Sequence, residues 1–249
     1  MIDLHIHILP GVDDGSQSME ESLYMAQMAA TSGVHTIVAT PHCNIPDEYD
    51  NYEGEAWVKK LEEFRREVKR LQIDLEILRG MEVFGTKQVP QLLKDGRLVC
   101  LNEGSYLLVE FAFEEDPLLV RQVLEGILMQ DKIPVVAHPE RYDFVARDPQ
   151  LVYEWNCMGC GIQMNKGSIL GRFGRQIREV SIELLRHQVV TCIASDAHGC
   201  SQRNPSLDSV WEVLERMFGE ECPMILLEDN PGRILDSEEI YRLMPRGFH

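Results

Sequence analysis

Side chains that commonly bind metal ions occur in several short motifs spread along the whole chain. Histidine and carboxylate side chains together suit divalent metals such as manganese, iron and zinc. Nine of them are more than one ion needs, so the sequence predicts a site that holds several metal ions. The five histidines and four carboxylates are His5, His7, Asp14, His42, Glu82, Glu110, His138, Asp196 and His198.

The first of these motifs alternates apolar and polar residues over positions 2–7. Because successive side chains of a β-strand point to opposite faces, His5 and His7 are expected on one face, about 7 Å apart along the strand. The same spacing relates Asp196 to His198, which follow an apolar run. Each pair can therefore direct two ligands toward the same rim.

Four other candidates lie beside or within apolar segments that are typical of strands. Proline is adjacent to His42 and to His138, and it ends a strand ladder and stiffens the loop that presents the ligand. A lone carboxylate in a strand as apolar as that around Glu110 costs several kcal/mol unless it is paired or bound to a metal. The segments are 36–41 before His42, 75–81 before Glu82, 106–113 around Glu110 and 133–137 before His138.

Each candidate alone is most often an ordinary core or surface residue, and an isolated His-x-His pair is a weak signal. The joint pattern is more specific, because five of the eight histidines follow predicted strands. In a (β/α) barrel the residues at the carboxyl ends of the strands meet on one rim. We therefore expect all nine side chains around a common cavity.

The order of the predicted elements supports such a barrel. Strands alternate with helices along the chain, and a length of 249 residues is usual for one α/β barrel, so we expect a single domain over 1–249. Ser18 predicts the start of a helix that runs toward Gly33, and Trp57, Leu61, Phe64, Val68 and Leu71 recur at helical spacing. Further helices are expected over 118–129, 149–157, 176–186 and 205–218, the last capped by Asn204, with strands over 161–165 and 223–227 and a terminal helical appendage over 230–249.

Composition limits the classes of partner. A formal net charge of −17 argues against nucleic acid and anionic membranes, which reward clustered lysine and arginine. No N-terminal segment resembles a signal peptide, and no apolar run reaches the roughly 18 residues of a membrane span. We therefore expect a cytoplasmic protein without membrane insertion.

The seven cysteines do not form a disulfide framework, since their number is odd and their spacing irregular. Cys157 and Cys160 have CxxC spacing but lack a second pair or nearby histidines for a zinc site. No cysteine is followed by the C-x5-R arrangement that cysteine-based phosphatases use to hold phosphate. We expect reduced thiols that pack or lie on the surface.

Several of these motifs together resemble the polymerase and histidinol phosphatase (PHP) superfamily. They are His5-Ile6-His7, Thr40-Pro41-His42, Gly80-Met81-Glu82, His138-Pro139-Glu140-Arg141 and Ser195-Asp196-Ala197-His198. More narrowly, residues 4–16 and the segment from His138 to Tyr142 resemble the CpsB/YwqE/CapC branch. The resemblance covers residues 2 to about 235 and implies a distorted (β/α)7 TIM-like barrel with three divalent ions, manganese first and iron or zinc as alternatives.

The resemblance also implies how the ligands are shared. His5, His7, Glu82 and Asp196 would hold one ion. Glu82 would bridge to a second ion that Glu110 and His138 also bind. Asp14, His42 and His198 would hold the third.

The implied activity is that of a protein-tyrosine phosphatase, a phosphoric monoester hydrolase in which a metal-activated hydroxide attacks phosphorus. Arg141 and Arg203 are placed to bind the phosphate in bidentate fashion. Asp196 or a bound water would protonate the leaving tyrosyl oxygen, and Lys166 is a weaker phosphate candidate that could equally be a solvated loop lysine. The implied partner is a phosphotyrosyl protein, the tyrosine-rich tail of a bacterial kinase that regulates capsular or exopolysaccharide synthesis.

Two other functions stay open on the sequence. One is a small-molecule phosphoesterase of histidinol phosphatase type, with the same metals and a narrower pocket. The other is a non-catalytic metal-bound PHP scaffold, against which the complete ligand set argues. The loops around 47–52 and 111–117 should shape access to the site, but their acidity does not separate the first two functions.

Overall fold

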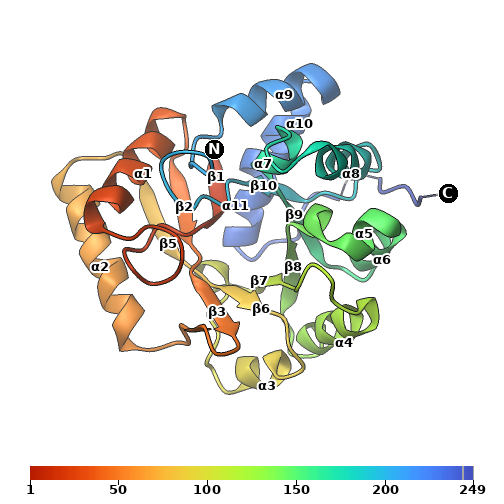
Figure 1. Cartoon of the computed structure of the whole chain (residues 1–249), viewed down its shortest axis with the longest axis horizontal. Coiled ribbons are helices and arrows are strands. Elements are labelled where there is room, and N and C mark those ends of the chain that lie inside the picture. The colour runs from red at the N-terminus through yellow and green to blue at the C-terminus, as the bar shows by residue number, and fades with distance from the viewer. Residues whose placement is uncertain (243, 249) are drawn as a thin grey trace.

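Strands occupy the centre of the molecule and helices surround them (Figure 1). The computed structural model describes residues 1–242 and 244–248. The strands are β1 (Ile2–Ile6), β2 (Thr36–Ala39), β3 (His42–Ile45), β4 (Tyr49–Asp50), β5 (Glu76–Arg79), β6 (Glu82–Phe84), β7 (Tyr106–Glu110), β8 (Ile133–Ala137), β9 (Gly161–Asn165) and β10 (Cys192–Ala194). They form two sheets, in the orders β1-β2-β5 and β10-β9-β8-β7-β6-β3-β4, and β3 pairs with β4 in antiparallel fashion while the other pairs are parallel.

Two of the barrel's strands are interrupted, which explains why there are two sheets. The chain passes from β2 to β3 through Thr40-Pro41 and from β5 to β6 through Gly80-Met81, and the backbone N–H of Gly80 still donates to Ala39 across the gap. A Cβ at Gly80 would lie 2.8 Å from Val38 Cγ1, so this close approach requires glycine.

The barrel closes between its first and last strands. A parallel bridge joins Ile6 to Ala197, just beyond β10, and Asp196 N–H donates to the His5 carbonyl over 2.8 Å. With β2 and β3 as one interrupted strand, and β5 and β6 as another, the described residues form the distorted (β/α)7 barrel that the sequence predicts.

Helices cover the outside of the barrel. They are α1 (Met19–Thr31), α2 (Glu55–Arg70), α3 (Val89–Lys94), α4 (Pro117–Leu128), α5 (Asp143–Arg147), α6 (Gln150–Cys157), α7 (Lys166–Ile169), α8 (Arg175–Arg186), α9 (Asp208–Phe218), α10 (Glu221–Met224) and α11 (Asn230–Leu235). None of the helices in the described part of the chain has the length and apolar character needed to cross a bilayer.

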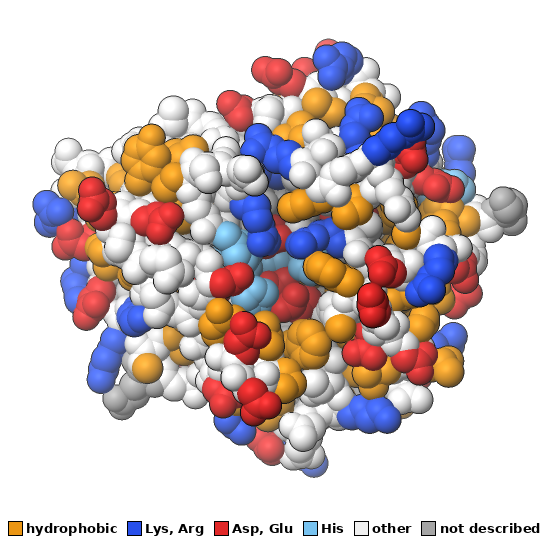
Figure 2. Space-filling model, viewed as in Figure 1, with side chains coloured by type: hydrophobic (Ala, Val, Ile, Leu, Met, Phe, Trp, Pro, Cys, Tyr) orange, Lys and Arg blue, Asp and Glu red, His pale blue; other side chains and the backbone are white. Residues whose placement is uncertain are grey.

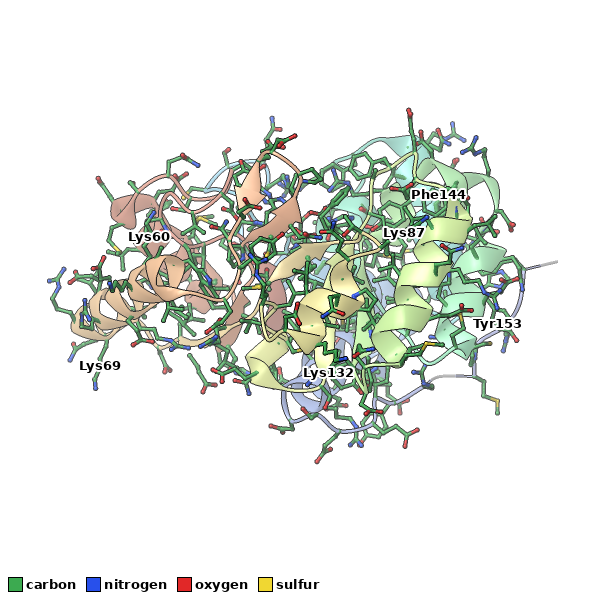
Figure 3. The ribbon with its side chains drawn as sticks, turned by 90° about the horizontal axis from the view of Figure 1, so that it is seen from below. Lys60, Lys69, Lys87, Lys132, Phe144 and Tyr153 are labelled. Carbon is green, nitrogen blue, oxygen red and sulfur yellow. The ribbon has the colours of Figure 1, made fainter. Side chains whose placement is uncertain are left out.

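The first two helices follow the sequence pattern. Ser18 caps α1 by accepting a hydrogen bond from Glu21 N–H. The apolar stripe of α2 is buried at four of its five positions, while Leu71 lies just beyond the helix and is 46% exposed. Lys69 projects outward from the opposite, charged side of α2 (Figure 3).

Two element predictions near the C-terminus were wrong. Residues 223–227 do not form a strand: they belong to α10 and to a π-helical turn, η3 (Ile225–Asp229), whose Leu226 and Leu227 are buried. A short apolar run cannot be assigned to strand or helix by periodicity alone. Helix α9 starts at Asp208 rather than near Pro205. Asn204 lies before the helix, where its Oδ1 accepts hydrogen bonds from Ser206 N–H and from Lys166 Nζ.

The final segment is helical over a shorter range than expected. Only α11 is helical within the described part of 230–249, and positions 243 and 249 lie outside the described residues. Ile234 and Leu235 of α11 join a buried cluster with strand residues such as Leu108 and Val135. This part of the segment is therefore part of the core.

Candidate metal centre

The nine predicted ligands lie together at one end of the barrel. Figure 2 shows histidine and acidic side chains in a central hollow of this face. His5 and His7 approach each other with their Nε2 atoms 3.2 Å apart, and both nitrogens are 3.6 Å from Asp196 Oδ1. Imidazoles and a carboxylate from the two ends of the chain therefore face one point.

Glu82 is at the centre of this group. Its Oε1 lies 3.1 Å from His5 Nε2 and 3.0 Å from His138 Nε2. Its Oε2 lies 3.1 Å from both His7 Nε2 and His42 Nδ1. One buried carboxylate thus contacts four imidazoles, which is the arrangement expected of a bridging ligand.

The remaining ligands lie toward the open side. Asp14 Oδ1 is 3.5 Å from His42 Nε2 and 3.4 Å from His198 Nε2, and the Asp14 side chain is 53% exposed. Glu110 Oε1 is 2.8 Å from His42 Nδ1, whereas its Oε2 is 3.9 Å from His138 Nε2. Glu110 therefore lies closer to His42 than to His138.

The ligand atoms fall into four overlapping sets, each with all its atoms within 4.8 Å of one another. These sets are His7, Asp14, His42 and His198; His5, His7 and Asp196; His5, Glu82 and His138; and His42, Glu82 and Glu110. These four sets have more residues in common with one another than the three groups implied by the family resemblance, in which only Glu82 is shared. In particular, His42 faces both Asp14 and the Glu82–Glu110 pair through its two nitrogens.

Backbone conformation helps to aim two of the ligands. His138 follows β8 with φ of 35°, and Asp196 follows β10 with φ of 49°. Left-handed backbone is uncommon for residues other than glycine and is concentrated at functional sites. In both places the strand ends and the ligand lies toward the common cavity.

The buried polar atoms of the cluster fit divalent cations. Glu82 Oε2, Glu110 Oε1 and His42 Nδ1 are buried and lack a hydrogen-bond partner, although they lie close together. Leaving such groups without a partner costs free energy that bound cations would remove. The mixture of imidazole and carboxylate oxygen suits manganese, iron or zinc.

Electrostatics favour ionised carboxylates in this cavity. Burial raises the pKa of Asp196, but the positive charges of His5 and Arg203 outweigh burial and hold this pKa below its usual range. The pKa of Glu82 is likewise lowered, because His5 and His42 outweigh the effect of burial. A hydrogen bond from His198 lowers the pKa of Asp14 to about 2. These carboxylates are therefore charged near neutral pH.

Two arginines meet Asp196 at the rim. Arg203 Nη2 lies 2.6 Å from Asp196 Oδ2, and Arg141 Nη1 lies 3.4 Å from the same oxygen. Each guanidinium has five N–H donors in a planar fork, so these contacts occupy only part of the hydrogen-bonding capacity. Both arginines that the sequence singles out thus border the cavity.

The sequence itself connects this site to known proteins. A family described as "Capsular polysaccharide synthesis, CpsB/CapC" matches residues 1–236. The chain belongs to the CpsB/CapC family.

Individual members of the CpsB/CapC family are similar over nearly the whole chain. The tyrosine-protein phosphatase YwqE of Bacillus subtilis is 35% identical, with 99% of this chain and 96% of YwqE covered. The tyrosine-protein phosphatase CpsB of Streptococcus pneumoniae is 30% identical, with 94% and 98% covered. A crystal structure from a study of YwqE and CpsB as metal-dependent tyrosine phosphatases has a TM-score of 0.93 at 34% identity and covers all of both chains.

Sequence reasoning missed the residue that orients His7 in this CpsB/CapC chain. Asp13 is buried, and its Oδ2 accepts from His7 Nδ1 over 2.7 Å and from His42 N–H over 3.0 Å. A proton on Nδ1 leaves His7 Nε2 free to bind a cation. The signal in the sequence was that Asp13 is a second aspartate, directly before the predicted ligand Asp14.

A second buried network supports His5 and Asp196. Gln163 Oε1 accepts from His5 Nδ1 over 2.9 Å, and Gln163 Nε2 donates to Asn165 Oδ1 over 2.9 Å. Asn165 Nδ2 then donates to Asp196 Oδ2 over 2.5 Å, and Glu140 Oε1 accepts from the Asn165 N–H. Two alternate residues of β9, Gln163 and Asn165, therefore hold two of the predicted ligands in place through hydrogen bonds.

Replacing Asp13 by asparagine should weaken metal binding by about 10- to 100-fold, because the carboxylate that fixes the His7 tautomer is lost. Competition with a chelator of known affinity measures this change. Asp74→Asn, at an exposed position, is the matched control and should bind metal normally. Equal affinity in Asp13→Asn and the unaltered protein would contradict the orienting role.

Lys166 has a structural role. From the sequence it is only a weak phosphate candidate or a solvated loop lysine. Its side chain is buried, and Nζ donates to the carbonyls of Asn204 and Ser206. Burial lowers the pKa of Lys166 to about 8. Lys166 is thus neither a phosphate ligand nor a solvated loop residue in this structure; it anchors the loop that carries Arg203.

Proposed function

We propose that this protein is a metal-dependent protein-tyrosine phosphatase that hydrolyses phosphotyrosine on a protein. The observation that carries the proposal is that nine histidine and carboxylate side chains able to hold metal ions converge with Arg141 and Arg203 at one rim. The named relatives of this CpsB/CapC chain are tyrosine-protein phosphatases, and they match it over nearly their full length.

The four ligand sets would hold divalent cations, for which we propose three ions of manganese. Cations at such a site neutralise charge on phosphoryl oxygens and lower the pKa of water. Iron and zinc fit the same donors, so single-metal reconstitution decides the identity.

The chain's own residues would bind and orient the substrate. Arg141 and Arg203 would donate hydrogen bonds to the phosphoryl oxygens and stabilise the charge that develops on them. Asp196 holds both guanidinium groups at the rim through Oδ2. Because Asp196 Oδ1 faces His5 and His7 while Oδ2 contacts both arginines, we assign Asp196 to metal binding and arginine orientation, and we assign protonation of the leaving tyrosyl oxygen to water.

We propose a phosphotyrosyl protein of polysaccharide synthesis as the substrate, specifically the tyrosine-rich tail of a bacterial kinase. The support is the description of the family, which is that of capsular polysaccharide synthesis. We also propose that the chain works as one domain, because α11 packs into the same core as the strands.

Chelation followed by reconstitution tests the proposed function. Activity on a phosphotyrosyl peptide should disappear on chelation and return with manganese. The value of kcat/KM for that peptide should exceed the value for histidinol phosphate by at least about tenfold. Activity that survives chelation would contradict the metal mechanism, and a preference for histidinol phosphate would favour the small-molecule alternative.

A further inference from the structure

Two phenylalanine rings lie against the guanidinium of Arg141. The guanidinium carbon is 4.7 Å from the centroid of Phe113 and 4.7 Å from the centroid of Phe173. These residues come from distant segments, one after β7 and the other after α7. Figure 2 shows basic and apolar side chains next to one another along one edge of the central hollow.

Phe113 packs against a buried aromatic residue, although part of its own surface is exposed to solvent. Its ring centroid lies 6.4 Å from that of the buried Tyr142, whose hydroxyl donates to the Ala137 carbonyl. The Phe113 carbonyl accepts from Asp143 N–H. The residue Phe113 is nevertheless 44% exposed, which is high for a large apolar residue.

Phe173 is fixed by a different contact. A Cβ at Gly167 would lie 2.8 Å from Phe173 Cε2, so the ring packs closely on the backbone of α7. Arg172 N–H donates to the Gly167 carbonyl and holds the loop against α7. Phe173 is therefore held beside α7 by its packing on Gly167 and by the neighbouring hydrogen bond of Arg172.

The arrangement favours an aromatic substrate. A guanidinium that stacks on aromatic rings offers its edge, with the N–H donors, to an anion. A phosphate bound at the edge of Arg141 would bring the group esterified to it near Phe113 and Phe173, whose rings lie against that guanidinium. A phenyl ring there gains aromatic contact and apolar burial, which the short chain of a phosphoserine cannot provide.

We propose that Phe113 and Phe173 form an aromatic wall that contacts the phenyl ring of phosphotyrosine and selects it over phosphoserine and phosphothreonine. The proposal rests on the proposed phosphatase function and adds its specificity determinants. The alternative role for the rings is only to position Arg141. That role predicts equal losses for every phosphate compound, whereas the wall predicts a loss only for aromatic ones.

Inhibition by three simple compounds separates these roles. Phenylphosphonate, methylphosphonate and inorganic phosphate share the phosphoryl oxygens, and only the first has a ring. In Phe113→Leu and Phe173→Leu, the inhibition constant of phenylphosphonate should rise about tenfold. The constants of the other two should stay within about twofold, and phenylphosphonate binding should be normal in Phe113→Tyr and Phe173→Tyr, which keep the aromatic ring.

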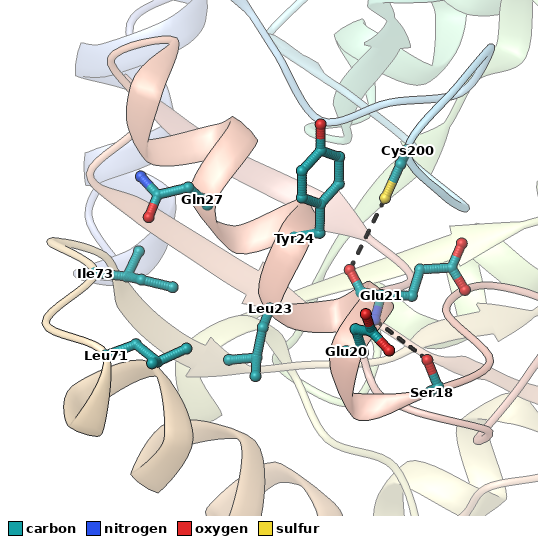
Figure 4. Close-up of a pocket in the computed structure, with 9 residues that line it drawn as sticks. All are labelled: Ser18, Glu20, Glu21, Leu23, Tyr24, Gln27, Leu71, Ile73 and Cys200. Carbon is teal, nitrogen blue, oxygen red and sulfur yellow. Dashed lines mark hydrogen bonds between the residues drawn. The ribbon is translucent and has the colours of Figure 1, made fainter.

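Leucine keeps apolar bulk, so these variants should fold. Tyr24→Leu is the control, because Tyr24 is a 61% exposed aromatic residue of α1 that lines a separate groove with Leu71 and Cys200 (Figure 4). It should leave all three constants unchanged.

Two results would contradict the proposal that Phe113 and Phe173 contact the substrate ring. Equal weakening of all three inhibitors would reduce the rings to a positioning role, and unchanged phenylphosphonate inhibition would remove them from the substrate site. Failure of the proposed function is a separate outcome, since it would appear as absent turnover of phosphotyrosyl peptide by the unaltered protein.

Discussion

Replacing Glu82 by glutamine should lower kcat/KM for a phosphotyrosyl peptide by about 10³-fold or more. Glu82 contacts four imidazoles, and glutamine keeps its shape while removing the charge that cations need. The loss of the charge stabilisation that metal ions provide, several kcal/mol, corresponds to this magnitude. Metal analysis of the purified variant should show fewer ions per chain than the unaltered protein.

The control for Glu82→Gln is Glu63→Gln, on the exposed side of α2. It removes one negative charge from the same protein and should keep both full activity and full metal content. Circular dichroism confirms that each variant is folded. Normal metal content together with normal turnover in Glu82→Gln would show that this carboxylate does not bridge the ligand sets.

Replacing Arg203 by alanine should lower kcat/KM by about 10²- to 10³-fold, which is the usual effect of removing one donor that stabilises developing charge. Metal content should be unchanged, because Arg203 contacts Asp196 through Oδ2 while the metal-facing Oδ1 keeps its contacts with His5 and His7. Steady-state kinetics and metal analysis on the same preparation measure both quantities.

Two further variants show whether the effect of Arg203→Ala is specific to the guanidinium of Arg203. Arg203→Lys should recover only part of the activity, since an ammonium supplies charge without the planar fork. Arg216→Ala, at an exposed position of α9, should behave as the unaltered protein. If Arg203→Ala lost metal as well as activity, its role would be to hold Asp196 rather than to bind phosphate.

The sequence predicts the barrel and the composition of the cavity because period-two alternation and strand ends are local signals. His5 and His7 fall on one face for this reason, and Asp196 and His198 follow β10 as expected. His42 and Glu82 differ, because each begins the second half of an interrupted strand. Alternation does not reveal where a strand is broken and resumed by Pro41 or Gly80.

The residues that sequence reasoning missed act through contacts between distant segments. Gln163 and Asn165 are ordinary polar positions of a strand until the fold places His5 and Asp196 beside them. Phe113 and Phe173 carry no local signal of their shared contact with Arg141. Overlapping ligand sets also depend on which nitrogen of His42 faces which carboxylate, and spacing along the chain does not determine that.

The contact between β1 and β10 that closes the barrel bears on when the proposed metal centre can form. Hydrogen bonds across it join His5 to Asp196 and His7 to Ala197, so ligands from both ends of the polypeptide become neighbours only there. Contacts so far apart in sequence form slowly, because closing a long loop costs conformational entropy. A ribosome-bound chain that stops short of Asp196 would lack part of the ligand set, and metal loading would therefore follow synthesis of almost the entire barrel.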